Sequence, residues 1–296
     1  MMSIFQNKGC FGTEKTAMDH LSSNAIIVVK LYTKDQMTKK IRSPINVNGS
    51  KQTLSSWIIE YFPEDYEGMT YVEPYCGGAN VFLNKLPSKE EILNDSDRGV
   101  VQIFKAMRDE PCEIIGRIKR TKFSERSFKR AKKKYCEGID DYVEGAIAEI
   151  ILRRMSKDGE NFHHSSEDVE NQREYEWDRM VEHLCLIKDR IDDTHVFCDQ
   201  ALKIIKIWDS PNTVMYVDPP YLSKDSTTEA QDNEMSIDDH IKLSNLLNNS
   251  KSYILLSGHP STLYNRLYKD WDCVKKNGRK TKRRKDRRIE CIWKNY

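Results

Sequence analysis

The stretch Met215–Leu222 (MYVDPPYL) places an acid, two prolines and an aromatic ring directly after a run of strand-forming residues. Proline lacks a backbone donor and fixes its own φ angle, so Pro219 and Pro220 end the strand at Asp218. The residue before a proline is held extended, which keeps Asp218 out of a helical turn. A carboxylate, the Pro219 carbonyl and the Tyr221 ring therefore project together from a strand end. In open α/β sheets, ligands bind at that edge.

A second group of chemistry-bearing residues lies in Glu73–Asn80 (EPYCGGAN), where a short strand ends. Gly77 and Gly78 allow close approach of the backbone to a ligand. The Gly-x-Gly-x-x-Gly pattern and the phosphate-loop Lys-Ser/Thr pair are both missing, which disfavours a pyrophosphate ligand. Asp95 ends the next expected strand, where an acid can accept hydrogen bonds from ribose hydroxyls. An adenosine compound that carries a cation, such as S-adenosylmethionine, would fit, although a plain turn and a helix cap also explain these residues.

Strand and helix patterns alternate along most of the chain, which predicts an α/β fold with a doubly wound, mostly parallel sheet. Between 111 and 194 the alternation gives way to densely charged helical patterns, which predicts an inserted helical domain. We expect a core formed by 41–110 and 195–296, preceded by an extension of unknown role at 1–40. The expected strands are 71–73, 91–95, 195–198, 214–218, 253–256 and 288–293, and the expected helices are 51–61, 79–83, 100–107, 238–247 and 263–268.

The composition bounds the class of protein. Of the 296 residues, 38% are hydrophobic, which is enough for a core, and 32% are charged. No apolar run approaches the roughly 20 residues of a membrane span, and the N-terminus lacks a signal-peptide pattern. The eight cysteines are scattered singly, which predicts reduced thiols and no metal site. We therefore expect a soluble cytoplasmic protein with no membrane or metal partner.

The net charge of +2 hides a strong asymmetry along the chain. Residues 275–288 contain ten basic residues and one acid, so the remainder is net acidic. Such a cluster is typical of a surface that binds a polyanion, although many charge runs are merely solvated. An alternating pattern at 288–293 predicts a strand directly after it, so we expect a basic loop held between ordered elements.

Three motifs in order, YVEPYCGGANVFLNK, ILND and VDPPY, with a helical insertion before the last, resemble those of the Dam-type DNA adenine methyltransferases, including phage members. The similarity continues in EMSIDDHIKLSNLLNNSKSYILLSGHPSTLYNRLYKDW and covers about residue 41 to the C-terminus. The resemblance implies a class I S-adenosylmethionine-dependent core with an inserted helical target-recognition domain. It also implies double-stranded DNA as partner, in a bacterial or phage-infected cell.

The resemblance assigns a cofactor role to several residues. The family's Gly-Gly-Lys segment corresponds to Gly49-Ser50-Lys51, with serine in place of the second glycine, and Val47 stands near the place of a usual aromatic residue. For Asp199, expected near the adenine ring of the cofactor, a helix cap is an equally good interpretation. The implied cofactor-binding residues are Lys51, Glu73, Gly77, Gly78, Asp95 and Asp199.

The resemblance also implies the chemistry of Asp218, Pro219, Pro220 and Tyr221. If Asp218 and the Pro219 carbonyl accept the two amino hydrogens of adenine, the nitrogen lone pair can be directed at a sulfonium methyl group without a strong base. Tyr221 would stack on the base, which must first be extruded from the duplex. Methylation of a cytosine amino group or of RNA by the same chemistry, and a DNA-binding protein that has lost turnover, remain alternatives.

The insertion and the basic loop are the expected DNA-binding elements, the first reading sequence and the second contacting backbone phosphates. Solvated helix faces are the alternative for most residues of the insertion. The candidate residues are Arg117, Arg120, Lys122, Arg126, Lys129, Arg130 and Arg153 in the insertion, and Arg279, Lys282, Arg283, Arg284 and Arg287 in the loop.

Overall fold

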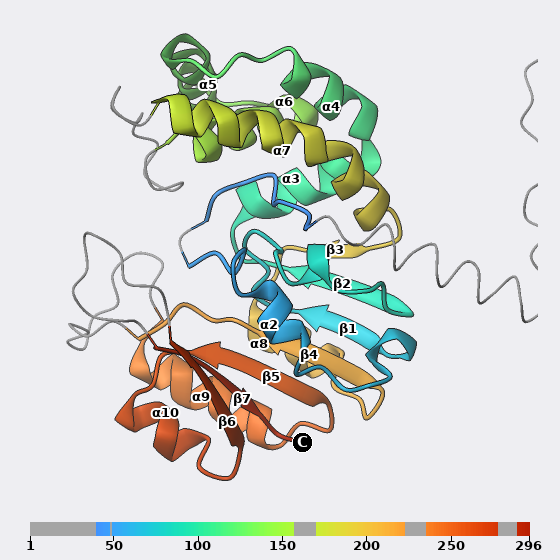
Figure 1. Ribbon diagram of the computed structural model, residues 1–296, viewed down its shortest axis with the longest axis vertical. Coiled ribbons are helices and arrows are strands. Elements are labelled where there is room, and N and C mark those ends of the chain that lie inside the picture. Colours follow the sequence, from blue (N-terminus) through green and yellow to red (C-terminus); the bar gives the residue numbers. More distant parts are fainter. Residues whose placement is uncertain (1–39, 48, 157–169, 223–234, 278–288) are drawn as a thin grey trace, which may run out of the picture. The chain divides into compact units, whose positions relative to one another are not determined.

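The computed structural model describes residues 40–47, 49–156, 170–222, 235–277 and 289–296, with the backbone alone for 170–173. Ile41–Tyr296 forms one compact unit built around a seven-stranded sheet of order β3-β2-β1-β4-β5-β7-β6 (Figure 1). The first five strands run parallel, and β7 is antiparallel to both neighbours. This confirms the predicted doubly wound, mostly parallel sheet. The strands are β1 (Thr70–Glu73), β2 (Glu90–Asn94), β3 (His195–Phe197), β4 (Thr213–Val217), β5 (Tyr253–Gly258), β6 (Asp272–Asn277) and β7 (Ile289–Lys294).

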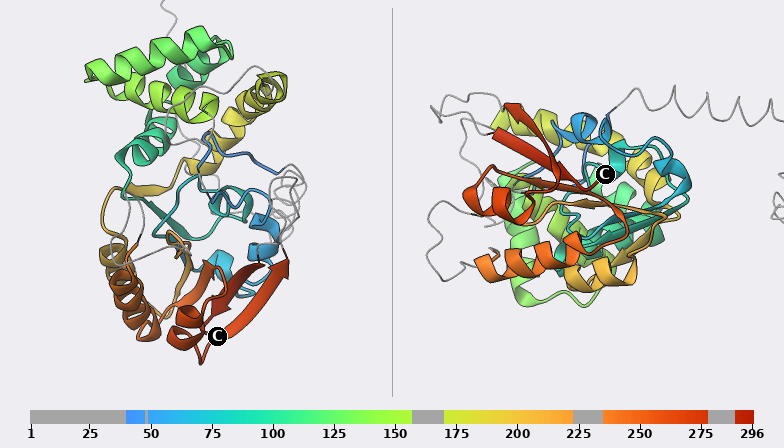
Figure 2. Two further views of the ribbon diagram at one scale, coloured as in Figure 1. Left: turned by 90° about the vertical axis from the view of Figure 1, so that its left-hand side faces the viewer. Right: turned by 90° about the horizontal axis from the view of Figure 1, so that it is seen from below.

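The central strands are buried on both faces, and their side chains alternate between two cores. Val214 and Tyr216 of β4 enter one core, while Met215 and Val217 enter the other. The second core is completed by α8 (Ala201–Ile207), α9 (Ile237–Asn248) and α10 (Thr262–Leu267). The first core includes α2 (Ser55–Ile59), which lies on the opposite face of the sheet from α9 (Figure 2). Burial on both faces explains why these strands read as continuous apolar runs.

The chain order changes direction between β1 and β4. From β1 the chain builds outward to β2 and β3, whereas from β4 it builds the other way to β5 and the β7–β6 hairpin. The carboxyl ends of β1 and β4 therefore lie side by side at the topological switch point. In open α/β sheets, this is the crevice where a ligand binds.

A run of helices connects β2 to β3. They are α3 (Arg98–Asp109), α4 (Pro111–Lys119), α5 (Glu125–Glu137), α6 (Tyr142–Met155) and α7 (Glu170–Ile191). Helix α6 packs closely on α3, because a Cβ at Gly99 would meet the Glu149 carboxylate at 2.5 Å and one at Gly145 would meet Gln102 at 2.3 Å. Figures 1 and 2 show α4–α7 beyond the β3 side of the sheet. The described residues 111–156 and 170–191 are thus mostly helical, and they pack on the core through α3.

The structure corrects three local expectations. No α-helix follows β1 at 79–83, because Gly77 and Ala79 have φ values of +45° and +49°, and only a 3₁₀ turn forms at Phe82–Asn84. The expected helix at 51–61 is shorter, as α2. Residues 275–277, expected in the basic loop, belong to β6, which pairs with β7 in register from Asp272↔Lys294 to Asn277↔Ile289.

Candidate active site

Asp218 directly follows β4 and forms an ion pair with Lys51. The Lys51 ammonium lies 2.8 Å from Asp218 Oδ2 and also donates to the Gly49 carbonyl at 2.9 Å. Lys51 is 6% exposed, so this pair is largely shielded from water. Pro219 behind it is buried and Pro220 is exposed. Lys51 was expected to bind cofactor, and the structure places it against the proposed catalytic carboxylate.

Tyr221 contacts charged and aromatic neighbours at its hydroxyl, at one face of its ring and at the edge of its ring. Its hydroxyl lies 3.1 Å from Asp218 Oδ1 and is also hydrogen-bonded to Glu290 of β7. The Lys51 ammonium lies over the ring, 4.7 Å from its centroid, and the His259 ring meets it edge-on at 4.7 Å. Burial, followed by the negative charges of Asp218 and Glu290, raises the pKa of the Tyr221 hydroxyl. The phenol therefore stays protonated and can donate to only one carboxylate at a time.

The glycine loop after β1 is shaped for close backbone approach. Gly77 has a left-handed φ of +45°, which favours glycine. A Cβ at Gly78 would lie 3.0 Å from both Ser43 Oγ and Asn80 Nδ2. The Ser43 side chain therefore packs closely against the glycine loop at this position. Ala79 adopts φ +49°, a conformation that non-glycine residues rarely take and that stores strain.

Asp95 stabilises the glycine loop from the end of β2. Its Oδ2 accepts from the Gly77 backbone at 2.8 Å, and its Oδ1 accepts from the Asp97 backbone at 3.0 Å. Each carboxylate oxygen has a second lone pair, so these bonds leave room for a ribose hydroxyl. Burial raises the pKa of Asp95, while the two backbone hydrogen bonds oppose the rise. The neighbouring Asn94 side chain bonds the Pro74 carbonyl at 2.8 Å and fixes this loop further.

Glu73 is the most perturbed acid of the site. It is 2% exposed, and burial followed by the nearby Asp218 charge raises its pKa to about 8. Its Oε2 and the Oδ1 of Asn80 are buried acceptors without a hydrogen-bond partner among the described residues. Buried acceptors left unpaired are costly, and a cationic ligand in the loop would satisfy them. The residues present therefore fit a positively charged adenosine cofactor.

The segment that carries Lys51 is anchored by two neighbouring regions. Ser50 replaces a glycine expected from the resemblance. Its hydroxyl accepts a hydrogen bond from Asn80 Nδ2 at 3.0 Å, so the serine side chain connects the Lys51 segment to the glycine loop. Val47 stands where the resemblance predicts an aromatic residue, and it lies next to the glycine loop: a Cβ added at Gly77 would be 3.7 Å from its side chain. Asn48 lies outside the described residues. From the insertion, the buried Arg154 guanidinium donates to the Ser43 and Pro44 carbonyls and to Asn46 Oδ1.

Residues 48–283 match the sequence profile of the D12 class N6 adenine-specific DNA methyltransferases. This chain belongs to that family. Among curated relatives, the "Modification methylase StsI" of Streptococcus sanguinis is 26% identical over 205 residues, which is 62% of this chain but 29% of that protein. The chain thus spans less than a third of the length of that relative.

Two solved structures resemble this D12-family chain at low identity. One is "Putative methyltransferase yhhF from Escherichia coli", with 11% identity and a TM-score of 0.36; the match covers 86% of this chain and 91% of that one. The other is a "putative RNA methyltransferase PH1948 from Pyrococcus horikoshii", with 10% identity and a TM-score of 0.41; the match covers 90% of this chain and 97% of that one. Likenesses this remote say nothing about substrate.

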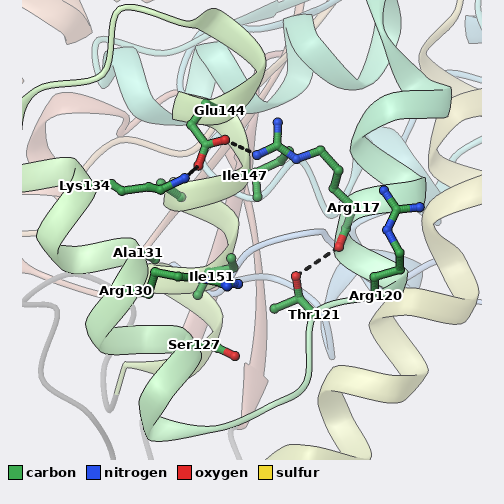
Figure 3. Close-up of a pocket in the computed structure, with 11 residues that line it drawn as sticks. Arg117, Arg120, Thr121, Ser127, Arg130, Ala131, Lys134, Glu144, Ile147 and Ile151 are labelled. Atoms are coloured by element: carbon green, nitrogen blue, oxygen red, sulfur yellow. Dashed lines mark hydrogen bonds and ion pairs between the residues drawn. The ribbon is translucent and has the colours of Figure 1, made fainter.

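The helical region between β2 and β3 of this D12-family chain carries a basic pocket of about 310 Å³ between α4, α5 and α6. Figure 3 shows Arg117 and Lys134 approaching the Glu144 carboxylate from opposite sides, with both side chains ion-paired to it. Arg120 and Arg130 also line the pocket and form no ion pair within the part of the chain that the structure describes. The pocket lining thus contains four basic side chains and one acid, and Arg117 also pairs with Glu113 outside it. Of the other sequence candidates, Lys122 and Arg126 are exposed, and Lys129 is exposed and pairs with Glu125 at 2.9 Å.

The structure gives two candidates a different environment from the one expected. Arg153 is 7% exposed and pairs with Glu149 at 2.8 Å and Asp97 at 2.7 Å, so its guanidinium joins α6 to α3 and is not presented to DNA. Asp199 pairs with Lys203 at 2.5 Å, which lowers the pKa of its carboxyl. The helix-cap alternative for Asp199 is wrong, because the N-cap position of α8 is Gln200. The loop candidates Arg279, Lys282, Arg283, Arg284 and Arg287 lie outside the described residues.

Sequence reasoning missed Glu290 and His259, which contact Tyr221. An acid within the otherwise apolar run of β7 was the available signal for Glu290, since acids are rarely buried without a partner. Among the described residues, no group of three or more metal-ligating side chains occurs, and no helix there has the length and apolarity needed to cross a bilayer. The described cysteines are free thiols.

Proposed function

We propose that this chain transfers a methyl group from S-adenosylmethionine to the exocyclic amino nitrogen of adenine in double-stranded DNA. One observation carries the proposal: Asp218 at the end of β4 lies beside Glu73 and the glycine loop at the end of β1, at the switch point of the sheet. An acceptor for an amino group and a loop for a cationic cofactor thus share one crevice. Membership of the D12 family supports adenine as the base and DNA as the polymer.

The cofactor half of the site would be formed by Glu73, Gly77, Gly78 and Asp95. When bound, S-adenosylmethionine supplies an electrophilic methyl group on a sulfonium centre. Glu73 and Asn80 would offer their unpaired acceptors to its cationic part, and Asp95 would accept ribose hydroxyls through its remaining lone pairs. The chain orients the donor in this way and needs no phosphate-binding loop. We assign Asp199 only a position near this pocket, held through its backbone by Asn94 at 3.0 Å.

The substrate half would be formed by Asp218, the Pro219 carbonyl and Tyr221. Two acceptors receive hydrogen bonds from the two amino hydrogens of the base, so the nitrogen lone pair is directed at the methyl group; one of these protons leaves the nitrogen as the new N–C bond forms. Most of the acceleration comes from holding the reacting atoms in line within about 3.5 Å. Tyr221 would stack on an extruded base, an interaction worth about 1–3 kcal/mol, which offsets part of the cost of extrusion. Lys51 must share Asp218 with the substrate, because its ammonium lies on that carboxylate.

The insertion at 111–194 would be the target-recognition region, and 41–110 with 195–296 the catalytic core. The basic pocket supports this assignment because arginine is the usual partner of both phosphates and guanine edges. The strand ends Asn277 and Ile289, between which the basic run lies in sequence, are paired with each other. The neighbouring pair Gly258↔Cys291 puts this end of β7 at the carboxyl end of β5, the edge that also carries Asp218. We propose that the run contacts DNA phosphates close to the site.

The test is to express the chain in a host that lacks DNA methylation and to map modified bases by single-molecule sequencing. Methylated adenine within one recognition sequence is the expected result, and Asp218→Ala serves as the matched inactive control. Methylated cytosine, or label found in RNA instead, would show that the same chemistry serves another substrate. Binding of labelled S-adenosylmethionine with no methyl transfer to any nucleic acid would favour a DNA-binding protein without turnover.

A further inference from the structure

The carboxylates of Asp218 and Glu290 both contact the Tyr221 hydroxyl and the Lys51 ammonium, beside the proposed substrate position. The Tyr221 hydroxyl is hydrogen-bonded to Asp218 and to Glu290, although it carries a single proton. The Lys51 ammonium lies 2.8 Å from Asp218 Oδ2 and 3.9 Å from Glu290 Oε1. Asp218 and Glu290 are therefore alternative acceptors for the single hydroxyl proton, and both lie within ion-pair distance of the same ammonium.

The position of Glu290 follows from the antiparallel course of β7. Gly258 at the end of β5 pairs with Cys291, so the start of β7 lies at the carboxyl edge of the parallel strands. Glu290 is 8% exposed there. A buried carboxylate is costly unless it is paired, and the Tyr221 hydroxyl and Lys51 ammonium provide that pairing. The acid is thus placed by the sheet itself, next to the end of β4.

His259 supports the same arrangement from the loop after β5. Its Nδ1 lies 3.0 Å from the Ile289 carbonyl and 3.8 Å from Glu290 Oε2, and its ring meets the edge of Tyr221. The Tyr221 ring is therefore fixed by His259 at its edge, Lys51 over its face and Glu290 at its hydroxyl. A ring held at three points can present a constant surface to a base.

We propose that Glu290 is a positioning residue: it holds the Tyr221 hydroxyl and shares the Lys51 ammonium, and so leaves Asp218 available to accept the amino hydrogens of the substrate base. This rests on the function proposed above. Without Glu290, the Tyr221 hydroxyl donates to Asp218 alone and the Lys51 ammonium, already 2.8 Å from Asp218, has no second anion, so both occupy the lone pairs that the base requires. The effect then falls on turnover through Asp218, and cofactor affinity is unchanged.

The experiment compares Glu290→Gln, Tyr221→Phe and the double variant in single-turnover methylation of duplex DNA. Glutamine keeps the shape and an acceptor but loses the charge that holds Lys51. We expect Glu290→Gln to slow methyl transfer by up to about 100-fold, with affinity for S-adenosylmethionine within about twofold of the parent. Because Tyr221→Phe removes the contested hydroxyl, the Glu290→Gln loss should be much smaller in that background. Independent, multiplying losses would overturn the proposal, since a merely structural role predicts them.

Controls separate this inference from the proposed function. Asp272→Asn removes a carboxylate at the end of β6 that lies away from Glu290 and that pairs at the surface with Lys294, and it should leave the rate unchanged. A parent protein that methylates no adenine overturns the function and this inference together. If the parent methylates adenine and Glu290→Gln does so at the same rate, this inference alone is overturned. If Glu290→Gln melts far below the parent, Glu290→Asp takes its place: it keeps the charge, but the shorter side chain withdraws the acceptor from the Tyr221 hydroxyl, and a rate within twofold of the parent then overturns the inference.

Discussion

The ammonium of Lys51 lies 2.8 Å from the carboxylate of Asp218, although the two residues lie more than 160 positions apart in the sequence. The contact joins the segment that carries Lys51 to the end of β4. Both partners are largely buried, so the pair is weakly screened by solvent and has a strong effect on how the carboxylate is used. The corner that the sequence assigned to cofactor binding is thus also part of the proposed catalytic centre.

Replacing Asp218 should stop methyl transfer with little effect on cofactor binding. Asp218→Ala removes an acceptor for the amino group, and we expect at least about a 10²-fold loss of single-turnover rate, as for other preorganised hydrogen-bonding groups. Incorporation of labelled methyl groups into DNA measures this. The parallel variant Asp218→Asn keeps one acceptor oxygen but leaves Lys51 without its nearest anion, so it should also be slow. Normal turnover in either variant would remove the mechanism.

Replacing Asp95 should weaken cofactor binding. Asp95→Ala removes both the proposed ribose acceptor and the bond that holds Gly77, so the dissociation constant for S-adenosylmethionine should rise by about tenfold or more, the effect of about 1.4 kcal/mol. Titration calorimetry checks this, and saturating cofactor should restore most of the rate. Glu90→Gln, at the exposed start of β2, is the matched control. An unchanged dissociation constant would show that Asp95 does not contact the cofactor.

The raised pKa of Glu73 predicts proton release when the cofactor binds. In the folded protein the carboxyl titrates at about 8, so it is mostly protonated at pH 7, and a bound cation favours the ionised form. Calorimetry at pH 7 in buffers of different ionisation enthalpy should show release of up to one proton, and Glu73→Gln should abolish it. Equal apparent enthalpies in all buffers would contradict the assignment.

The same carboxyl affects stability without ligand. Between pH 4.5, its ordinary value, and about 8, the folded state binds more protons at this group than the unfolded state does. The contribution of Glu73 to the free energy of unfolding is therefore largest below pH 4.5 and falls as pH rises through this window. Urea unfolding at pH 5.5 and 8 should show a fall for the parent that is smaller in Glu73→Gln.

Removing the unpaired arginines of the insertion pocket should change the salt dependence of DNA binding. The logarithm of DNA affinity falls with the logarithm of salt concentration, and each phosphate that is no longer neutralised makes this negative slope shallower by about 0.9. Arg120→Ala with Arg130→Ala should therefore make it shallower by up to about 2. Neutralising Arg283, Arg284 and Arg287 in the basic run should also make it shallower. Lys133→Ala, exposed and already paired with Glu137, is the control. Slopes equal to that of the parent would show that these residues stay in solvent.

Arg154 should control both stability and the Lys51 corner. Arg154→Met leaves the buried Ser43 and Pro44 carbonyls without a donor, at a cost of about 1–3 kcal/mol for each unpaired group. Denaturant unfolding measures the loss, and cofactor affinity should fall with it because the segment leading to Lys51 is released. A destabilised variant with unchanged affinity would show that the anchor is structural only.

The parts predictable from sequence were those set by local chemistry. The strand end at Asp218 follows from two prolines, and the loop at Gly77 from a glycine pair, so their positions were correct to within a residue. Short continuous apolar runs predicted the strands of the parallel sheet, and alternation predicted β7. Strand β6 was missed because its exposed lysines resemble a loop and its pairing with β7 is not local.

What the sequence left open depends on contacts between distant segments. The environment of Lys51 includes Glu290, and nothing near either residue indicates the other. Arg153 and Arg154 look like surface charges on a helix, yet both are buried, because α6 is covered by α3 and by the chain at 43–46. Burial of a charged side chain is decided by tertiary packing, which composition and periodicity do not report.

The anchoring of 42–46 by Arg154 of α6 and His183 of α7 divides the helical region into two kinds of surface. The exposed arginines lie on or beside α4 and α5, whereas the residues bonded to the catalytic corner come from α6 and α7. If α4 and α5 contact DNA as proposed, substitutions in these two helices can give new target sequences while α6 and α7 keep the segment at 42–46 in place. We expect variants selected for altered site preference to arise in α4 and α5 and to spare Arg154.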